Sequence, residues 1–98
     1  MTYQSFKSEL LQRYPVCECC GFRKATEVHH CLYHRIKGRD ELDCIQNCSA
    51  VCHHCHMDGK VNSYEYQVKH WEKRRLEGFD MARWLDNLGW YSKEYWGK

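Results

Sequence analysis

Two short cysteine pairs constrain the fold of this chain more than any other feature of its sequence. Cys17 and Cys20 form one Cys-x-x-Cys pair, Cys52 and Cys55 form a second, and thirty-one residues separate the two pairs. Each pair can present two sulfurs from one tight turn, so together they complete the tetrahedron of a closed structural zinc site. Gly21 follows the first pair directly and suits the left-handed backbone that such turns often need. The spacing predicts one structural zinc ion held by these four cysteines.

The metal interpretation of the cysteines depends on a reducing compartment. The first fifteen residues, MTYQSFKSELLQRYP, are polar and lack the apolar segment of a signal peptide, and no apolar stretch is long enough to span a bilayer. We therefore expect a cytoplasmic protein without a membrane association, whose thiols stay reduced. A rival assignment replaces one cysteine by a histidine inside the second pair, but side chains at those positions should point outward. The remaining cysteines are interpreted as small buried apolar side chains: Cys19, Cys31, Cys44 and Cys48.

Composition indicates one small folded domain over residues 1–98. Apolar residues make up 43% of the 98 residues and aromatic residues 14%, which argues against disorder. A chain of this length buries a modest core, so a stabilising metal is expected. The net charge of +2 says little about partners by itself.

Local patterns predict a mixture of helices and short strands. Apolar residues at spacings of three and four predict a helix over residues 3–14, with Thr2 as its N-cap and Pro15 after its end. Residues 26–33 and 44–51 favour two short strands, and a short helix should follow within VCHHCHM and end near Gly59.

Two helices are expected in the C-terminal extension, residues 63–98. Ser63 can cap a helix over 64–76, and Asp80 can cap a second helix that Gly89 ends. In the first, one face should pack on the core, formed by Tyr64, Val68, Trp71 and Arg75. The opposite face should be polar and exposed, formed by Lys69, His70, Lys73 and Arg74. The aromatic tail GWYSKEYWGK is a candidate surface for a protein partner.

Histidines and one asparagine accompany the cysteine pairs. His29 and His30 are adjacent on a predicted strand, Asn47 lies in the next one, and His56 directly follows the second pair. Adjacent strand residues face opposite sides, so the two histidines cannot bind one ion in the same way, although both can border one reaction centre. The order Cys-x-x-Cys, His-His, Asn, Cys-x-x-Cys-His resembles the zinc-stapled branch of the His-Asn-His (HNH) endonucleases, over about residues 17–60.

That resemblance implies a small ββα-metal finger with a four-cysteine structural zinc site. With the N-terminal helix and the two C-terminal helices predicted above, the expected fold class is α+β. The resemblance also implies a metal-dependent DNA endonuclease or nickase. His30 would be the general base, since histidine exchanges protons near neutral pH. His29 and His56 would hold one divalent ion (Mg²⁺, Mn²⁺, Ni²⁺, Co²⁺ or Zn²⁺), and Asn47 would tie the loop between the strands and help to orient His30. Small domains of this type resemble those of phages, mobile elements and bacterial defence systems, hence a bacterial or phage-infected host cell.

Basic residues provide candidate contacts to DNA phosphates, with weak sequence preference or specificity from a partner. They lie in the loop after the first strand, one helical turn after His56, and on the polar face of the 64–76 helix: Arg35, Lys37, Arg39, Lys60, Lys69, Lys73 and Arg74. Two alternatives stay open. One is a zinc-stapled nucleic-acid-binding module that does not cut, and the other is a structural zinc protein that binds another protein through its aromatic tail.

Overall fold

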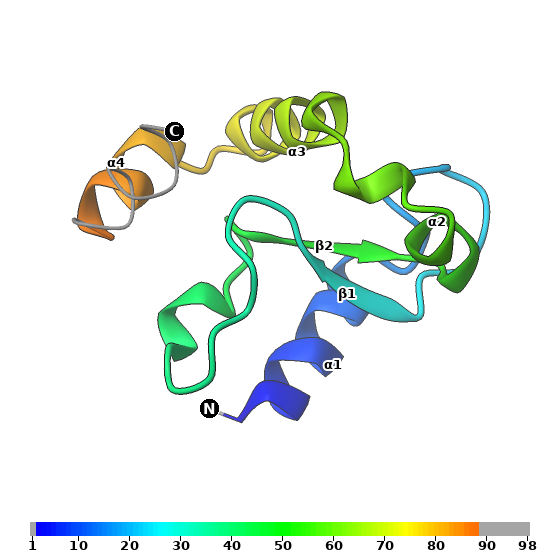
Figure 1. Ribbon diagram of the computed structural model, residues 1–98, viewed down its shortest axis with the longest axis horizontal. Helices are drawn as coiled ribbons and strands as arrows, with labels where there is room; N and C mark the ends of the chain where they lie inside the picture. The colour runs from blue at the N-terminus through cyan, green and yellow to red at the C-terminus, as the bar shows by residue number, and fades with distance from the viewer. Residues whose placement is uncertain (1, 89–98) are drawn as a thin grey trace.

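A two-stranded antiparallel hairpin lies at the centre of the chain in a computed structural model, which describes residues 2–88 (Figure 1). β1 (Glu27–His30) pairs with β2 (Cys48–Val51), with His30 opposite Cys48. Both strands are shorter than expected. The reason is local: the side-chain oxygen of Asn47 accepts the backbone N–H groups of Leu32 and Tyr33, which therefore take no part in the ladder.

Helices cover both faces of the hairpin. α1 (Tyr3–Arg13) packs on one face, and α2 (His53–Met57) and α3 (Tyr64–Leu76) lie on the other (Figure 1). All four residues of β2 are buried, because neither face of this strand reaches solvent. Two short 3-10 helices, η1 (Asp40–Leu42) and η2 (Lys60–Asn62), lie in the connections, and α4 (Met81–Asn87) follows α3. The mixed helix and sheet class is confirmed, with a radius of gyration of 12.9 Å.

The helix starts are where the sequence predicts them. Thr2 Oγ1 accepts the N–H of Ser5, Ser63 Oγ accepts that of Tyr66, and Asp80 Oδ1 accepts that of Arg83, at 3.0–3.1 Å. Each cap satisfies a backbone donor that the first helical turn leaves without a partner. The predicted stop at Gly89 and the aromatic tail lie outside the described residues.

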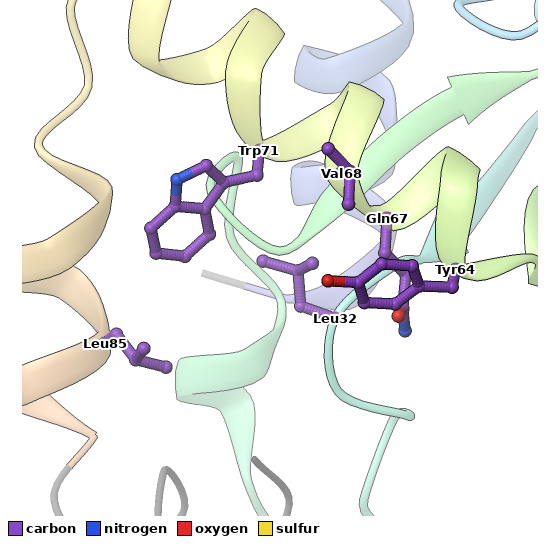
Figure 2. Close-up of a pocket in the computed structure, with 6 residues that line it drawn as sticks. All are labelled: Leu32, Tyr64, Gln67, Val68, Trp71 and Leu85. Carbon is purple, nitrogen blue, oxygen red and sulfur yellow. The ribbon is translucent and has the colours of Figure 1, made fainter.

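The predicted faces of α3 are correct only in part, since Trp71 packs against the core as expected. Tyr64 and Val68 are 71% and 44% exposed, whereas Tyr66, His70 and Arg74 are buried. The exposed apolar side chains line a cavity of about 330 Å³ between α3 and α4 (Figure 2). The physical reason for the reversal is that the buried polar groups have partners inside the protein.

Arg74 has the largest set of such partners. Its guanidinium binds both carboxylate oxygens of Glu18 at 2.6 and 2.9 Å and donates to the carbonyls of Ile45 and Cys48, both at 2.8 Å. Glu18 also accepts the N–H of Ala50 at 2.7 Å. This network joins the first cysteine pair, β2 and α3. No helix among residues 2–88 has both the length and the apolar character to cross a membrane.

Candidate metal centre and histidine site

The four paired cysteines converge in one cluster. Their Sγ atoms all lie within 4.8 Å of one another, the arrangement that the spacing predicts: Cys17, Cys20, Cys52 and Cys55. Zinc–sulfur bonds of about 2.3 Å in a tetrahedron place sulfurs roughly 3.8 Å apart. The cluster therefore fits one tetrahedral ion, and it is the only group of three or more such ligands among residues 2–88.

Each cysteine pair forms a tight turn that directs both sulfurs inward. The N–H of Cys20 donates to Cys17 Sγ at 3.5 Å, and the N–H of Cys55 donates to Cys52 Sγ at 3.4 Å. Gly21 has φ of 77°, in the left-handed region that glycine adopts without strain. Cys52 is also the N-cap of α2, so the second turn positions this helix.

The thiols of the cluster influence one another's protonation. Backbone N–H groups, that of Phe22 first, lower the pKa of Cys20 to about 6. Burial and the neighbouring thiols raise the pKa of Cys55. Four adjacent sulfurs cannot all be anionic by themselves, and a divalent cation is the species that replaces their protons together.

The other four cysteines were expected to be buried apolar side chains, and this holds for two of them. Cys31 and Cys48 are buried, whereas Cys19 and Cys44 are partly exposed. Burial raises the pKa of Cys31 to about 12, so that it stays a neutral thiol.

His29 and His56 come together on the α2 face of the hairpin. Their ring centroids are 5.4 Å apart, with one ring edge toward the other. His29 is buried, and burial together with His56 lowers its pKa to about 4. The ring is therefore neutral at pH 7, the form that binds metals. The pair is a candidate for two ligands of one divalent ion, and imidazole nitrogens favour manganese, cobalt, nickel or zinc over magnesium in raw affinity.

His30 lies on the opposite face, as the alternation along a strand requires. Its ring stacks on that of Tyr3 from α1, with centroids 6.3 Å apart, and its Nε2 hydrogen-bonds Asp43 Oδ1 at 2.8 Å. Both side chains of this hydrogen bond are only 9% exposed. A carboxylate at Nε2 favours the tautomer with hydrogen on Nε2, so Nδ1 is the nitrogen with a free lone pair.

Asn47 ties the loop between the strands. Its Oδ1 accepts the N–H groups of Leu32 and Tyr33 at 3.1 and 2.9 Å, and its Nδ2 donates to the carbonyls of Tyr33 and Leu42 at 3.0 and 2.9 Å. Its backbone carbonyl accepts the N–H of Cys31, the residue after His30. The amide is fully buried, so all of its hydrogen-bonding capacity serves the backbone.

Two carboxylates at the site are absent from the residues that the sequence predicts. Glu27 hydrogen-bonds His56 Nδ1 through Oε1 at 2.6 Å, and Asp43 hydrogen-bonds His30. Glu27 precedes His29 by two residues and so shares its face of the strand, a signal that was present in the sequence. Asp43 is thirteen residues from its partner and carried no such signal.

The predicted phosphate-binding residues divide into two groups. Five have exposed side chains: Arg35, Lys37, Arg39, Lys60 and Lys69. Lys73 is partly buried, and its Nζ lies 2.6 Å from Glu18. Arg74 is wrong as a surface contact, because its side chain is fully buried against Glu18. The basic loop forms one wall of a cavity of about 450 Å³ that Asp43 also lines.

Comparisons of the chain with protein-family models, curated proteins and solved structures found no match. Its class therefore follows from its own residues. The chain is a small domain of mixed helix and sheet with four cysteines placed to bind a metal ion and two adjacent imidazoles on the hairpin face that α2 covers.

Proposed function

We propose that this chain is a metal-dependent DNA endonuclease or nickase of the HNH type, with a ββα-metal core over residues 17–60. The single observation that supports this most is that the rings of His29 on β1 and His56 on α2 come together, with their centroids 5.4 Å apart. The second cysteine pair starts α2, so the ion that we assign to the four-cysteine cluster, zinc, would hold His56 in register with the hairpin.

The residues of the chain have distinct roles in this proposal. His30 Nδ1 takes a proton from a water as its oxygen attacks the scissile phosphorus, and Asp43 stabilises the imidazolium that results. The bond to the 3′ oxygen then breaks, which leaves a 3′-hydroxyl and a 5′-phosphate. Asn47 holds the loop that carries Asp43 close to His30. The exposed basic residues hold the DNA backbone.

His29 and His56 would hold the divalent ion, which would supply positive charge to neutralise the phosphate and the departing oxygen. Two imidazoles leave positions for water and phosphate oxygens. The ion can therefore be Mg²⁺, Mn²⁺, Ni²⁺, Co²⁺ or Zn²⁺.

A second candidate is a zinc-stapled module that binds nucleic acid without cutting it. The observation in its favour is the environment of His30, which is 9% exposed and faces away from His29 and His56. The basic loop would then bind phosphates without any chemistry following.

Supercoiled plasmid incubated with the zinc-loaded protein and Mn²⁺ or Mg²⁺ separates the two functions. The endonuclease function predicts nicked or linear DNA from the wild type and a loss of about 10²–10⁴-fold in rate for His30→Ala, the contribution typical of general-base catalysis. His54→Ala is the matched control, because His54 is exposed and pairs locally, with Asp58 at 2.9 Å. If wild type and His30→Ala bind DNA alike and neither cuts it, the binding module is the correct function.

A further inference from the structure

Glu27 reaches from the hairpin to α2 and uses both carboxylate oxygens there. Oε1 hydrogen-bonds His56 Nδ1 at 2.6 Å, and Oε2 hydrogen-bonds Nδ1 of His53. Because residues 27 and 29 are two apart on β1, Glu27 and His29 face the same side. One strand therefore presents a carboxylate and an imidazole to one helix.

The hydrogen bond to Glu27 determines which nitrogen of His56 is available. A carboxylate accepts, so Nδ1 must carry the hydrogen, and Nε2 is the nitrogen that can offer a lone pair to a ligand. His56 thus has one ring nitrogen held by the protein and one left for a ligand.

We propose that Glu27 is a positioning residue for the divalent ion, which fixes the tautomer and ring orientation of His56; this inference rests on the proposed function. Histidines that bind metals in proteins characteristically donate their second N–H to a carboxylate or carbonyl, and the charge increases their strength as ligands. Glu27 itself need not touch the ion.

The two hydrogen bonds of Glu27, to His53 and to His56, differ in importance. His53 is 70% exposed, so water competes for its hydrogen bond, whereas the side chains of Glu27 and His56 are 29% and 35% exposed. Removal of His53 should therefore leave the Glu27–His56 bond in place. This makes His53→Ala a matched control for the loss of one Glu27 partner without loss of the positioning.

The test measures Mn²⁺ affinity of the zinc-loaded protein by the electron paramagnetic resonance signal of free Mn²⁺. Glu27→Ala should weaken binding by about 10–100-fold, the usual effect of removing such a partner of a metal ligand. Glu27→Gln keeps an acceptor oxygen without the charge and should weaken binding less, by roughly three- to tenfold. His53→Ala should bind as the wild type does. Zinc content and thermal midpoint are measured for each variant, so that unfolding is recognised.

A second readout does not involve the ion. In the zinc-loaded protein without Mn²⁺, ¹⁵N NMR should find the hydrogen of His56 on Nδ1 in the wild type and on either nitrogen in Glu27→Ala. If Glu27→Ala does not fold, Glu27→Gln decides, and unchanged Mn²⁺ affinity in that variant overturns the inference.

Variants of the two histidines distinguish a wrong role for Glu27 from a wrong ion site. If His29→Ala and His56→Ala bind Mn²⁺ as tightly as the wild type, the proposed ion site itself is wrong. If both lose Mn²⁺ while Glu27→Ala retains wild-type affinity, only the role of Glu27 is wrong.

Discussion

Buried polar residues join α3 to the hairpin through hydrogen bonds. His70 Nε2 donates to the carbonyl of Gln46 at 2.7 Å, so its Nδ1 accepts the hydroxyl of Ser49 at 2.8 Å. Ser49 in turn accepts the thiol of Cys31 at 3.2 Å. A serine beside a histidine suggests nucleophilic catalysis, but both are buried and all their atoms serve this chain of hydrogen bonds.

His70 should make stability depend on pH. Burial, with a contribution from Arg74, lowers its pKa to about 4, below the ordinary value near 6.5 of an unfolded chain. The unfolded state therefore binds the proton more readily, and the stability from neutral His70 is present above pH 6.5 and lost as pH falls toward 4. Between pH 7.5 and 5, the wild type should lose about 2 kcal/mol through this residue.

Urea unfolding of wild type and His70→Gln at pH 7.5, 6 and 5 measures this effect. His29 titrates in the same direction but is present in both proteins, so its contribution cancels. The free-energy difference between the two proteins should narrow by about 2 kcal/mol as pH falls. The comparison is limited to conditions in which both retain the same zinc content. A difference in unfolding free energy that stays constant from pH 7.5 to 5 would contradict the lowered pKa of His70.

At the scale of elements, helix starts and the metal cluster could be predicted because their signals are local or follow a fixed spacing. Thr2, Ser63 and Asp80 cap their own helices, and each cysteine pair completes one turn. The face of α3 could not be predicted in this way. Arg74 is an ordinary surface residue by its sequence pattern and is buried only because Glu18, fifty-six residues earlier, neutralises it. No pattern within the helix contains that information.

The same reasoning applies to the candidate site. The resemblance implied that Asn47 holds the loop between the strands and that His56 lies beside His29, and the structure shows both arrangements. Asp43 could not be found, because its approach to His30 depends on how the intervening loop closes through Asn47.

The Arg74–Glu18 ion pair should stabilise the packing of α3 against the first cysteine turn. Arg74→Met should destabilise the domain by about 3–5 kcal/mol, because it leaves a buried carboxylate without its main partner. Lys73→Met removes the partly buried second partner of the same carboxylate while Arg74 remains, and it should cost less, about 1 kcal/mol. Denaturant unfolding measures both.

A double variant, Arg74→Met with Glu18→Gln, should recover part of the loss, since no unpaired charge remains. A role of Arg74 as a DNA contact predicts a different result. If Arg74→Met weakens DNA binding at unchanged stability, Arg74 contacts DNA and its structural role with Glu18 is wrong.

For the whole molecule, the four-cysteine cluster connects two segments that are far apart in the sequence. Cys17, Cys52 and Cys55 belong to the larger of two apolar clusters, which extends to Leu42 and Met81. The smaller cluster lies between α1 and the other face of the hairpin. A chain of 98 residues with its apolar groups divided in this way has a limited core, so the ion should provide a large share of its stability.

Removal of the metal should therefore unfold the domain, while loss of the histidine ligand should not. Structural zinc sites contribute about 10–16 kcal/mol of apparent binding free energy at pH 7, comparable to the whole stability of a small domain. Cys52→Ser removes one ligand and the N-cap of α2 together, so it should lose both zinc and helical circular dichroism. His56→Ala should keep its zinc and its spectrum but lose DNA cleavage, because its ring lies outside the cluster. Equal unfolding of both variants would show that the two sites are not separate, and elemental analysis that finds no zinc in the natively folded protein would exclude the structural ion altogether.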